Sequence, residues 1–456
     1  MRALNFQWSL ILVLVMATFL RFFGLGAIPG PIFDEVFYPL FAISYLTGES
    51  FFSVHPPLGS YLIAISVFLY DIFPFSEALE LSSTSIETIN PISYRWLGAL
   101  CGVCLIYVSY RLSLELVESK IFAVLTALFF CLDGSLLVDS RLGLINVFFT
   151  FFGFMALLSF VKGIKFMNKW CFVFAGLSLG AAFSVKWNGL GFWLVLVLFC
   201  LQFFLIKKIL ELSGNSREKI LNLNLSSSLL IFVTPFIVYL FLWIPDLIHN
   251  QRPITDQHAQ MLSYHFENGE DKEHPYSSPW YTWPIMMRPI GYYFNGEFLS
   301  DVGSTGKEIF QAIHLFPNPA LNFFSMLAII LMTFKWFEMI SSSLGNKAMH
   351  RDLAAISFIC IGFYANFLPW AIASRSTFIY HFQPSACFAF MALAYLLYQA
   401  SSKKKLEYKA LVIGVLALVI ISSIYWLPIQ LGIPISSESF YSRSGLVRGY
   451  KYGQSK

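Results

Sequence analysis

An acidic pair, Asp34 and Glu35, interrupts the apolar and aromatic stretch that runs from Pro31 to Tyr38. A charged side chain at a membrane interface costs free energy, so its presence calls for a compensating role. Partial burial raises the proton affinity of a carboxylate towards that of a working general base. The pair is therefore predicted to be catalytic. It could instead cap a helix that lies on the membrane surface, and the residues alone leave both roles open.

Four basic residues stand at positions expected near the outer ends of helices, namely Arg95, Arg141, Lys186 and Arg375. Arginine and lysine suit a phosphate because they form charge-assisted hydrogen bonds with it. Any one of them could instead extend towards lipid headgroups. Together, beside an acidic pair, they predict a binding site for a phosphate-bearing donor.

Two histidines join these candidates. His55 precedes Pro56-Pro57, which fix the backbone at the start of a helix, and His381 follows Tyr380 near the outer end of a late helix. Either imidazole could form a hydrogen bond with a sugar or an acid, although a lone histidine is commonly structural. Both are predicted to bind substrate.

The segment from Ser278 to Pro289 contributes three further candidates, Trp280, Trp283 and Arg288, which stand among prolines. Rigid prolines and aromatic faces suit the docking of a sugar or a peptide. They suit an aromatic belt at the membrane interface equally well. The three residues are predicted to form an acceptor-binding loop, with the belt as the alternative.

Several other kinds of site have no signature in the sequence. No glycine-rich nucleotide loop follows a strand, which argues against a soluble nucleotide-sugar donor and favours a membrane-borne one. The seven cysteines show neither metal-ligand nor disulfide spacing. No metal site is predicted, although a divalent cation such as Mg or Mn could assist a phosphate. The net charge of +4 is small and scattered, so nucleic acid is not an expected partner.

The elements that must position these residues are helices in a membrane. Of the 456 residues, 57% are hydrophobic and 12% are charged, whereas soluble domains carry about twice that charged fraction. The mean hydropathy of +0.67 requires repeated apolar runs of about 20 residues, each long enough to cross a bilayer. Lipid offers the backbone no hydrogen-bond partner, so spanning segments must be helical. The predicted fold is an all-α, multi-pass integral membrane protein.

About eleven apolar segments are predicted to span the membrane by their length. They are 8–25, 94–112, 121–138, 142–161, 170–186, 188–206, 227–244, 320–340, 353–372, 378–400 and 409–428. The shorter run 57–73 is interpreted as a helix at the membrane surface, because the short loops rich in lysine and arginine then share one side, the cytoplasm. The amino terminus is then inside, and two large segments, about 26–91 and 245–318, lie outside.

The chain resembles the protein O-mannosyltransferases at a series of motifs in the same order. They are Asp34-Glu35, His55-Pro56-Pro57-Leu58, Ser140-Arg141, Ser184-Val185-Lys186-Trp187-Asn188-Gly189, and Tyr380-His381 with Pro384. These are membrane glycosyltransferases of the GT-C superfamily, in glycosyltransferase family 39. The segment from Ser278 to Pro289 resembles their bacterial branch. The second external segment is too short for the β-trefoil insert of eukaryotic members, which also points to a bacterial enzyme.

The resemblance implies an inverting enzyme that moves mannose from a polyprenyl-phosphate donor to Ser or Thr hydroxyls of secreted proteins. It implies Asp34 as the base, with Glu35 beside it, and Arg95 as a ligand of the donor phosphate. The expected partners are the lipid-linked sugar, a secreted polypeptide, the bilayer and the secretion machinery, at the external face of the plasma membrane. Residues 1–245 are predicted to form the N-terminal glycosyltransferase domain. Residues 246–456 are predicted to form the second external loop and a C-terminal four-helix domain.

Two alternative functions stay open. Lipid A aminoarabinose transferases also place an acid after the first helix and use a polyprenyl-phosphate donor, but their acceptor is a lipid phosphate. A transporter is the alternative from another class of protein. Transporters tend to show inverted repeats and ionisable groups at the midplane, whereas the ionisable groups here concentrate at outer helix ends. That placement favours a transferase.

Overall fold

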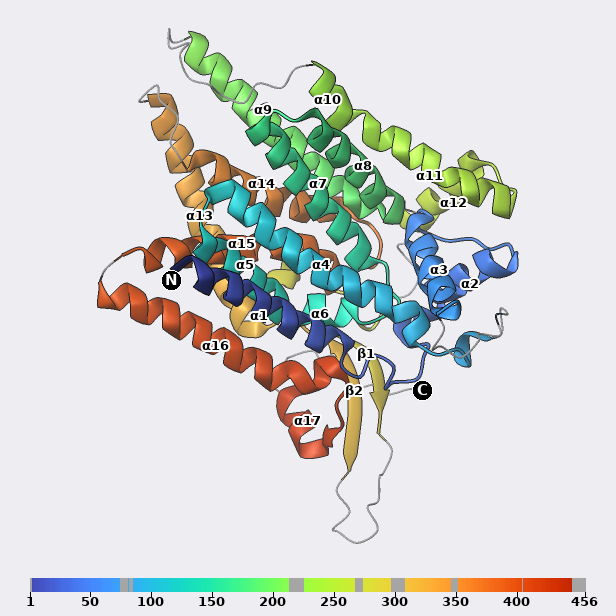
Figure 1. Cartoon of the computed structure of the whole chain (residues 1–456). Coiled ribbons are helices and arrows are strands. Elements are labelled where there is room, and N and C mark those ends of the chain that lie inside the picture. Colours follow the sequence, from blue (N-terminus) through green and yellow to red (C-terminus); the bar gives the residue numbers. More distant parts are fainter. Residues whose placement is uncertain are drawn as a thin grey trace.

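The computed structural model describes residues 2–73, 81, 85–212, 225–266, 274–296, 308–345, 352–403 and 405–444. Within these ranges the chain is mostly helical. Long helices lie side by side in a bundle, and the shorter helices α2, α3 and α12 gather at the same end of it as a β-hairpin (Figure 1).

Thirteen helices, of which α6 and α10 are short, form the bundle and correspond to the predicted apolar segments. They are α1 (Arg2–Phe22), α4 (Ile92–Val117), α5 (Lys120–Leu132), α6 (Gly134–Ser140), α7 (Asn146–Phe166), α8 (Lys169–Val185), α9 (Leu190–Leu212), α10 (Leu225–Phe232), α11 (Thr234–Asn250), α13 (Pro319–Gly345), α14 (Leu353–Phe367), α15 (Gln383–Ser401) and α16 (Leu406–Leu431). The connecting segments hold the shorter elements. They are η1 (Phe33–Val36), α2 (Tyr38–Thr47), α3 (Leu58–Asp71), η2 (Ser85–Glu87), η3 (Trp187–Gly189), α12 (Ile254–Phe266), η4 (Trp280–Ile285), η5 (Leu368–Ile372), η6 (Ile379–Phe382) and α17 (Ser437–Ser444).

Six helices in the described ranges are long and apolar enough to cross a bilayer, or up to eight if each bent pair counts as one span. The chain is therefore a mostly helical, multi-pass membrane protein, and the figure of about eleven spans stays a prediction. Helix α3, which matches the predicted surface helix 57–73, has 14 residues and is too short to be counted among these spans.

A break in one spanning segment brings polar residues to the end of the bundle. Helices α5 and α6 meet at an angle of 62° around Asp133. The Asp133 carboxylate accepts a hydrogen bond from the backbone N–H of Leu136 (2.9 Å) and so caps α6. Because α6 is only seven residues long and ends at Ser140, it presents Asp139 and Arg141 near the turn that follows α1.

The prediction of an all-α fold is wrong in one respect, because the described residues also form a three-stranded sheet of order β1-β2-β3. Strand β1 (Ile290–Asn295) pairs antiparallel with β2 (Ile309–Leu315), which pairs antiparallel with β3 (Ile435–Ser436). Tyr292 has no partner in β2, since the register shifts between Gly291 and Tyr293. Such a bulge redirects a side chain, and it turns Tyr292 towards α6.

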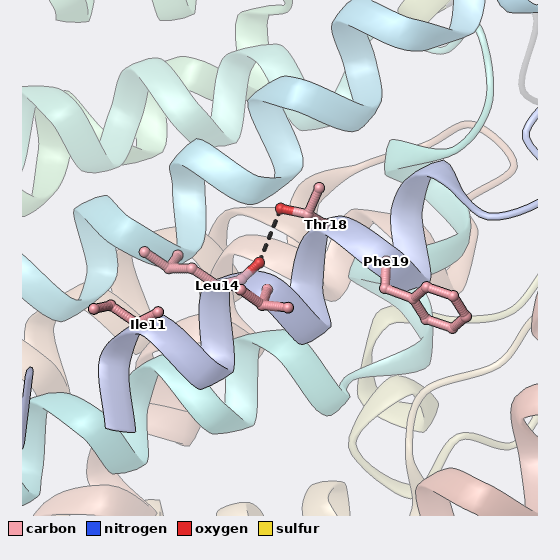
Figure 2. Close-up of a pocket in the computed structure, with 5 residues that line it drawn as sticks. Ile11, Leu14, Thr18 and Phe19 are labelled. Carbon is pink, nitrogen blue, oxygen red and sulfur yellow. Dashed lines mark hydrogen bonds between the residues drawn. The ribbon is translucent and has the colours of Figure 1, made fainter. Parts of the chain in front are cut away.

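The outward face of α1 is apolar, as expected of a helix that faces lipid. Val15 and Phe19 are exposed, and with Ile11, Leu14 and Thr18 they line a shallow depression (Figure 2). The polar side chain of this depression is satisfied within the helix, because the Thr18 hydroxyl donates to the backbone carbonyl of Leu14 (2.9 Å). This face lies outside the candidate site.

Candidate active site

Asp34 lies in the η1 turn between α1 and α2, and its carboxyl is free. The side chain is half-buried, and no described residue forms a hydrogen bond with its carboxylate oxygens. Burial raises the pKa of Asp34 to about 6, with a further contribution from the negative charge of Asp139, against the opposing charge of Lys186. A free carboxyl with a pKa close to neutrality has the properties of a general base.

Glu35, the next residue, is fully buried, and its carboxylate is hydrogen-bonded throughout. Its carboxylate accepts two hydrogen bonds from Arg95, to Oε1 (2.7 Å) and Oε2 (2.6 Å). It also accepts from the backbone N–H groups of Gly143 (2.8 Å) and Ile32 (3.1 Å). Every acceptor direction is therefore used within the protein. The sequence analysis predicted a catalytic role for Glu35. These hydrogen bonds instead make Glu35 a positioning residue that fixes the turn carrying Asp34.

Arg95 was predicted as a phosphate ligand, and the structure gives it other partners. Besides the two bonds to Glu35, its Nη1 donates to the carbonyls of Leu25 (3.1 Å) and Ile28 (2.8 Å). Its side chain is 1% exposed. Because each of its nitrogens already has a protein partner, the guanidinium ties α4 to the segment after α1 and does not present itself to a donor.

Arg141 has a comparable structural position, again contrary to its predicted phosphate contact. Its Nη1 donates to the backbone carbonyls of Leu20 (2.7 Å), Arg21 (3.1 Å) and Phe23 (2.9 Å). The last carbonyls of a helix lack partners within that helix, so a buried cation there is stabilising. Arg141 therefore caps the carboxyl end of α1.

Lys186 shares its surroundings with Asp34. It follows the last residue of α8, and its Nζ donates to the Asn146 side-chain carbonyl (2.9 Å) and lies 5.2 Å from the centre of the Tyr380 ring. Burial lowers the pKa of Lys186 to about 7, with help from Arg375, while Asp139 and Asp34 oppose that shift. The Lys186 ammonium group is thus a positive charge that acts on the Asp34 carboxyl.

Arg375 and His381 line a cavity of about 450 Å³. Arg375 Nη2 lies 3.4 Å from His381 Nε2, a contact in which the imidazole nitrogen accepts. Burial, with the charges of Lys186 and Arg375, holds the pKa of His381 well below its usual range, so the ring is neutral. The rest of the wall is largely apolar and includes Trp187, Leu190, Trp193, Leu194, Pro369 and Ile372.

His55 is buried behind this site. Its ring lies 6.2 Å from Tyr38 and 5.7 Å from His265, both nearly parallel to it. Burial holds the pKa of His55 well below its usual value, and the charges of Lys186 and Arg375 act in the same direction. The charges of Lys186 and Arg375 therefore reach His55, whose imidazole is neutral, and its role in substrate binding stays a prediction.

The sequence model described as dolichyl-phosphate-mannose-protein mannosyltransferase matches residues 11–250. The chain belongs to this family. A second model, described as the C-terminal four-TMM region of protein O-mannosyltransferase, matches residues 251–447 of this mannosyltransferase family member. The resemblance seen in the sequence motifs is thereby confirmed.

Relatives with a similar length exist among bacteria. The chain is 24% identical to the polyprenol-phosphate-mannose–protein mannosyltransferase of Mycolicibacterium smegmatis, over 95% of this chain and 91% of that protein. It is 23% identical to the protein of the same description from Mycobacterium tuberculosis, over 94% and 89%. Protein O-mannosyltransferase 1 of Drosophila melanogaster is 35% identical over 52% of this chain and 26% of its own length.

Solved structures share the fold. The Saccharomyces cerevisiae protein O-mannosyltransferase Pmt1-Pmt2 complex bound to the sugar donor matches with a TM-score of 0.80 at 14% identity, over 98% of this chain and 93% of that chain. ArnT from Cupriavidus metallidurans, bound to undecaprenyl phosphate, matches with a TM-score of 0.52 at 13% identity, over 96% and 75%. The chain therefore has the GT-C fold.

The predicted acceptor loop of this mannosyltransferase packs against the site from behind. Trp283 is 1% exposed, donates to the Ser278 hydroxyl (3.1 Å) and lies 6.0 Å from the His381 ring. Arg288 donates to the Ser277 carbonyl (3.3 Å), and Trp280 is half-buried. The sequence analysis predicted that Trp283 binds the acceptor. The structure instead buries this side chain, which packs against His381.

Two residues that the sequence analysis did not select adjoin Asp34. Asp139 is 1% exposed and accepts a hydrogen bond from the Tyr292 hydroxyl (3.2 Å), and the Tyr292 ring stacks on Phe33 at 3.9 Å. An acid within an apolar segment is a recognisable signal for Asp139. Tyr292 carried no such signal, because its position depends on a strand bulge.

The described residues of the site offer no preformed all-protein cage for a cation. Among the described residues, no group of three or more His, Cys, Asp or Glu side chains could hold a metal ion. The function proposed for this site uses no metal ion.

Proposed function

We propose that this chain transfers mannose from polyprenol-phosphate mannose to Ser or Thr hydroxyls of secreted polypeptides, with inversion at the sugar carbon and Asp34 as the base. The observation that carries this proposal is the free, half-buried Asp34 carboxyl, whose pKa is raised to about 6 beside the Lys186 ammonium. Family membership and the bacterial relatives support the donor and the protein acceptor.

The reaction is a single displacement. The Ser or Thr oxygen forms a bond to the anomeric carbon while the bond from that carbon to the phosphate oxygen breaks, and polyprenyl phosphate leaves. Asp34 takes the hydroxyl proton as the bond forms, because a neutral hydroxyl is a weak nucleophile. The carboxylate also favours the positive charge that develops on the sugar ring.

The departing phosphate needs positive charge, and two cations are available for it. The positive charge of Arg375 lowers the proton affinity of the Lys186 ammonium group, so the two cations act on one region. Arg375 lines the largely apolar cavity, which suits a prenyl chain beside its phosphate. Preorganised cations of this kind stabilise a leaving group as its charge grows.

Removing the Arg375 guanidinium should weaken donor binding. A hydrogen bond to a charged group contributes enough for Arg375→Ala to raise the KM for polyprenol-phosphate mannose by roughly 10- to 150-fold. Steady-state transfer to a Ser/Thr peptide measures this. Arg288→Ala is the matched control, since Arg288 contacts only the Ser277 carbonyl in its own segment. Equal KM values for Arg375→Ala and wild type would contradict the assignment.

The pH dependence follows from two groups. Asp34 must be deprotonated to act, so kcat/KM should rise with pH through about 6. Lys186 must be protonated to bind phosphate, so kcat/KM should fall as pH rises through about 7. The profile in subsaturating donor should therefore be a narrow bell, whose limbs belong to the coupled pair. Lys186→Arg should move the alkaline limb upwards, and a flat profile from about pH 5 to about pH 9 would contradict both roles.

The membrane arrangement is part of the proposal. It comprises about eleven spans, a cytoplasmic amino terminus and an active site on the external face of the plasma membrane, where secreted chains emerge from the secretion machinery. The division at residues 245 and 246 falls inside α11 and stays a prediction. Cysteine labelling with an impermeant reagent in intact cells tests this topology, with Glu49→Cys expected to react from outside.

A direct assay tests the proposed function. Membranes containing the chain are incubated with labelled polyprenol-phosphate mannose and either a Ser/Thr-rich peptide or phospholipid and lipid A acceptors. Label is expected in the peptide. Label in lipid alone would indicate an aminoarabinose-transferase-like acceptor, and donor uptake by vesicles without any transfer would indicate a transporter.

A further inference from the structure

Asp139 holds an acceptor atom that the protein leaves unused. The side chain is 1% exposed, and its Oδ1 accepts a hydrogen bond from the Tyr292 hydroxyl (3.2 Å). Its Oδ2 is equally buried and has no hydrogen bond of normal geometry in the ranges the structure describes, although the Asn146 and Gln383 side-chain amides stand close enough to the carboxylate to favour its charged form. A buried carboxylate oxygen without a donor costs free energy, so a ligand that supplies one is favoured.

The Asp139 carboxylate and the Asp34 carboxyl share the same surroundings. The charge of Asp139 contributes to the raised proton affinity of Asp34, and both carboxylates act on Lys186. A short chain of contacts also joins them, because Tyr292 bonds to Asp139 and stacks on Phe33, the neighbour of Asp34. A molecule held between Asp34 and Lys186 is therefore within the surroundings of Asp139.

Depth distinguishes the two carboxylates. Asp34 is half-buried and can meet a hydroxyl that arrives on a polypeptide from outside, whereas Asp139 is almost fully enclosed. A group reached by Asp139 must be small and carried into the site by the donor. The donor sugar has this size and is rich in O–H donors, and a carboxylate is an acceptor-only group that binds them through short, charge-assisted bonds.

We propose that Asp139 is a specificity-determining residue whose free carboxylate oxygen accepts a hydrogen bond from a hydroxyl of the donor sugar, an inference that rests on the function proposed above. Asp139 then selects the sugar, while Asp34 activates the acceptor. The alternative is that Asp139 has a structural role alone, joining α6 to β1 through Tyr292 and interacting with the Asn146 and Gln383 amides. The two roles predict different effects on donors that lack one hydroxyl.

The experiment compares kcat/KM for polyprenol-phosphate mannose and for a set of monodeoxy analogues, each lacking one mannose hydroxyl. The full-length wild type should reject at least one analogue by roughly 10- to 150-fold, the range for a hydrogen bond to a charged group. In Asp139→Asn and Asp139→Ala, the ratio between the native donor and that analogue should fall by a similar factor. Tyr292→Phe removes the bond to β1 but keeps the carboxylate, and should keep the wild-type ratio.

Two results overturn the inference. One is a wild type that uses every analogue as well as the native donor, a readout that needs no variant to fold. The other is an Asp139 variant that loses activity equally for all donors, as a purely structural contact would cause. Both leave the proposed function standing as long as the wild type transfers mannose. If the wild type transfers nothing from the native donor, the proposed function itself fails first.

Discussion

Replacing Asp34 by asparagine is expected to lower the rate of mannose transfer to peptide by roughly 100- to 10,000-fold at neutral pH, the usual contribution of a general base. Asparagine keeps the size of the side chain and removes its ability to take a proton. The Asp34 carboxylate has no hydrogen bond to any residue described, so its loss breaks no packing contact of its own. The rate loss should therefore appear with unchanged thermal stability in detergent.

A matched control separates the chemistry from the loss of charge. Glu49 is an exposed acid in the same external segment, and its backbone carbonyl, not its side chain, accepts from His249 (2.8 Å). Glu49→Gln should therefore transfer mannose at the wild-type rate. Asp34→Asn should also keep a donor KM within a fewfold of wild type, because Lys186 and Arg375 are untouched. Transfer by Asp34→Asn at more than about a tenth of the wild-type rate would remove Asp34 from the mechanism.

The sequence allowed Asp34 to be selected because a carboxylate after an apolar helix is a local signal. It also allowed Lys186, Arg375 and His381 to be selected, and the structure brings these three together around Tyr380 and the cavity. The charge of these residues and their predicted side of the membrane were enough to select them, since each stands at the boundary between a helix and an external segment.

The same reasoning could not tell ligands from structural cations. Arg95 and Arg141 stand at helix ends, as Lys186 does. However, Arg95 binds Glu35 and the Ile28 carbonyl, and Arg141 binds the Leu20 carbonyl. Which residue receives an arginine depends on long-range packing, which spacing along the chain does not encode. Trp283 shows the same dependence on long-range packing. A segment rich in proline and tryptophan can lie on a surface or in a core, and Trp283 is buried.

The fold was predictable where length alone decides it. Each predicted apolar segment contains a helix, because apolar runs in lipid must form one. The hairpin β1–β2 was not predicted, because it lies in a polar external segment where neither length nor apolar periodicity separates strand from loop. The bulge at Tyr292 depends on that hairpin, so Asp139 and its partner could not be joined from the sequence.

The second large effect is expected on stability, at the pair that holds the turn of Asp34. Glu35→Ala should destabilise the protein by about 3–5 kcal/mol, because it leaves the Arg95 guanidinium buried without a counter-charge. The substitution also deprives the backbone N–H groups of Gly143 and Ile32 of their acceptor. Thermal unfolding in detergent, followed by tryptophan fluorescence, measures the loss.

An exposed ion pair provides the control for that measurement. Lys208 and Glu211 lie 3.0 Å apart on the surface of α9, and solvent screens their charges. Glu211→Ala should therefore change stability by no more than about 0.5 kcal/mol. If Glu35→Ala were as mild as Glu211→Ala, the buried pair would not be what fixes the turn.

A double replacement separates stability from catalysis at the same pair. Glu35→Leu with Arg95→Met removes both charges, and apolar side chains in place of a buried pair commonly recover much of the lost stability. The turn would still lack the four hydrogen bonds that Glu35 accepts, from Arg95, Gly143 and Ile32. Transfer should therefore remain low in a protein that is folded again, because a base displaced by about 1 Å can lose about 100-fold in rate. Full activity in the stable double variant would mean that Asp34 is held by its own surroundings, and that Glu35 acts on folding alone.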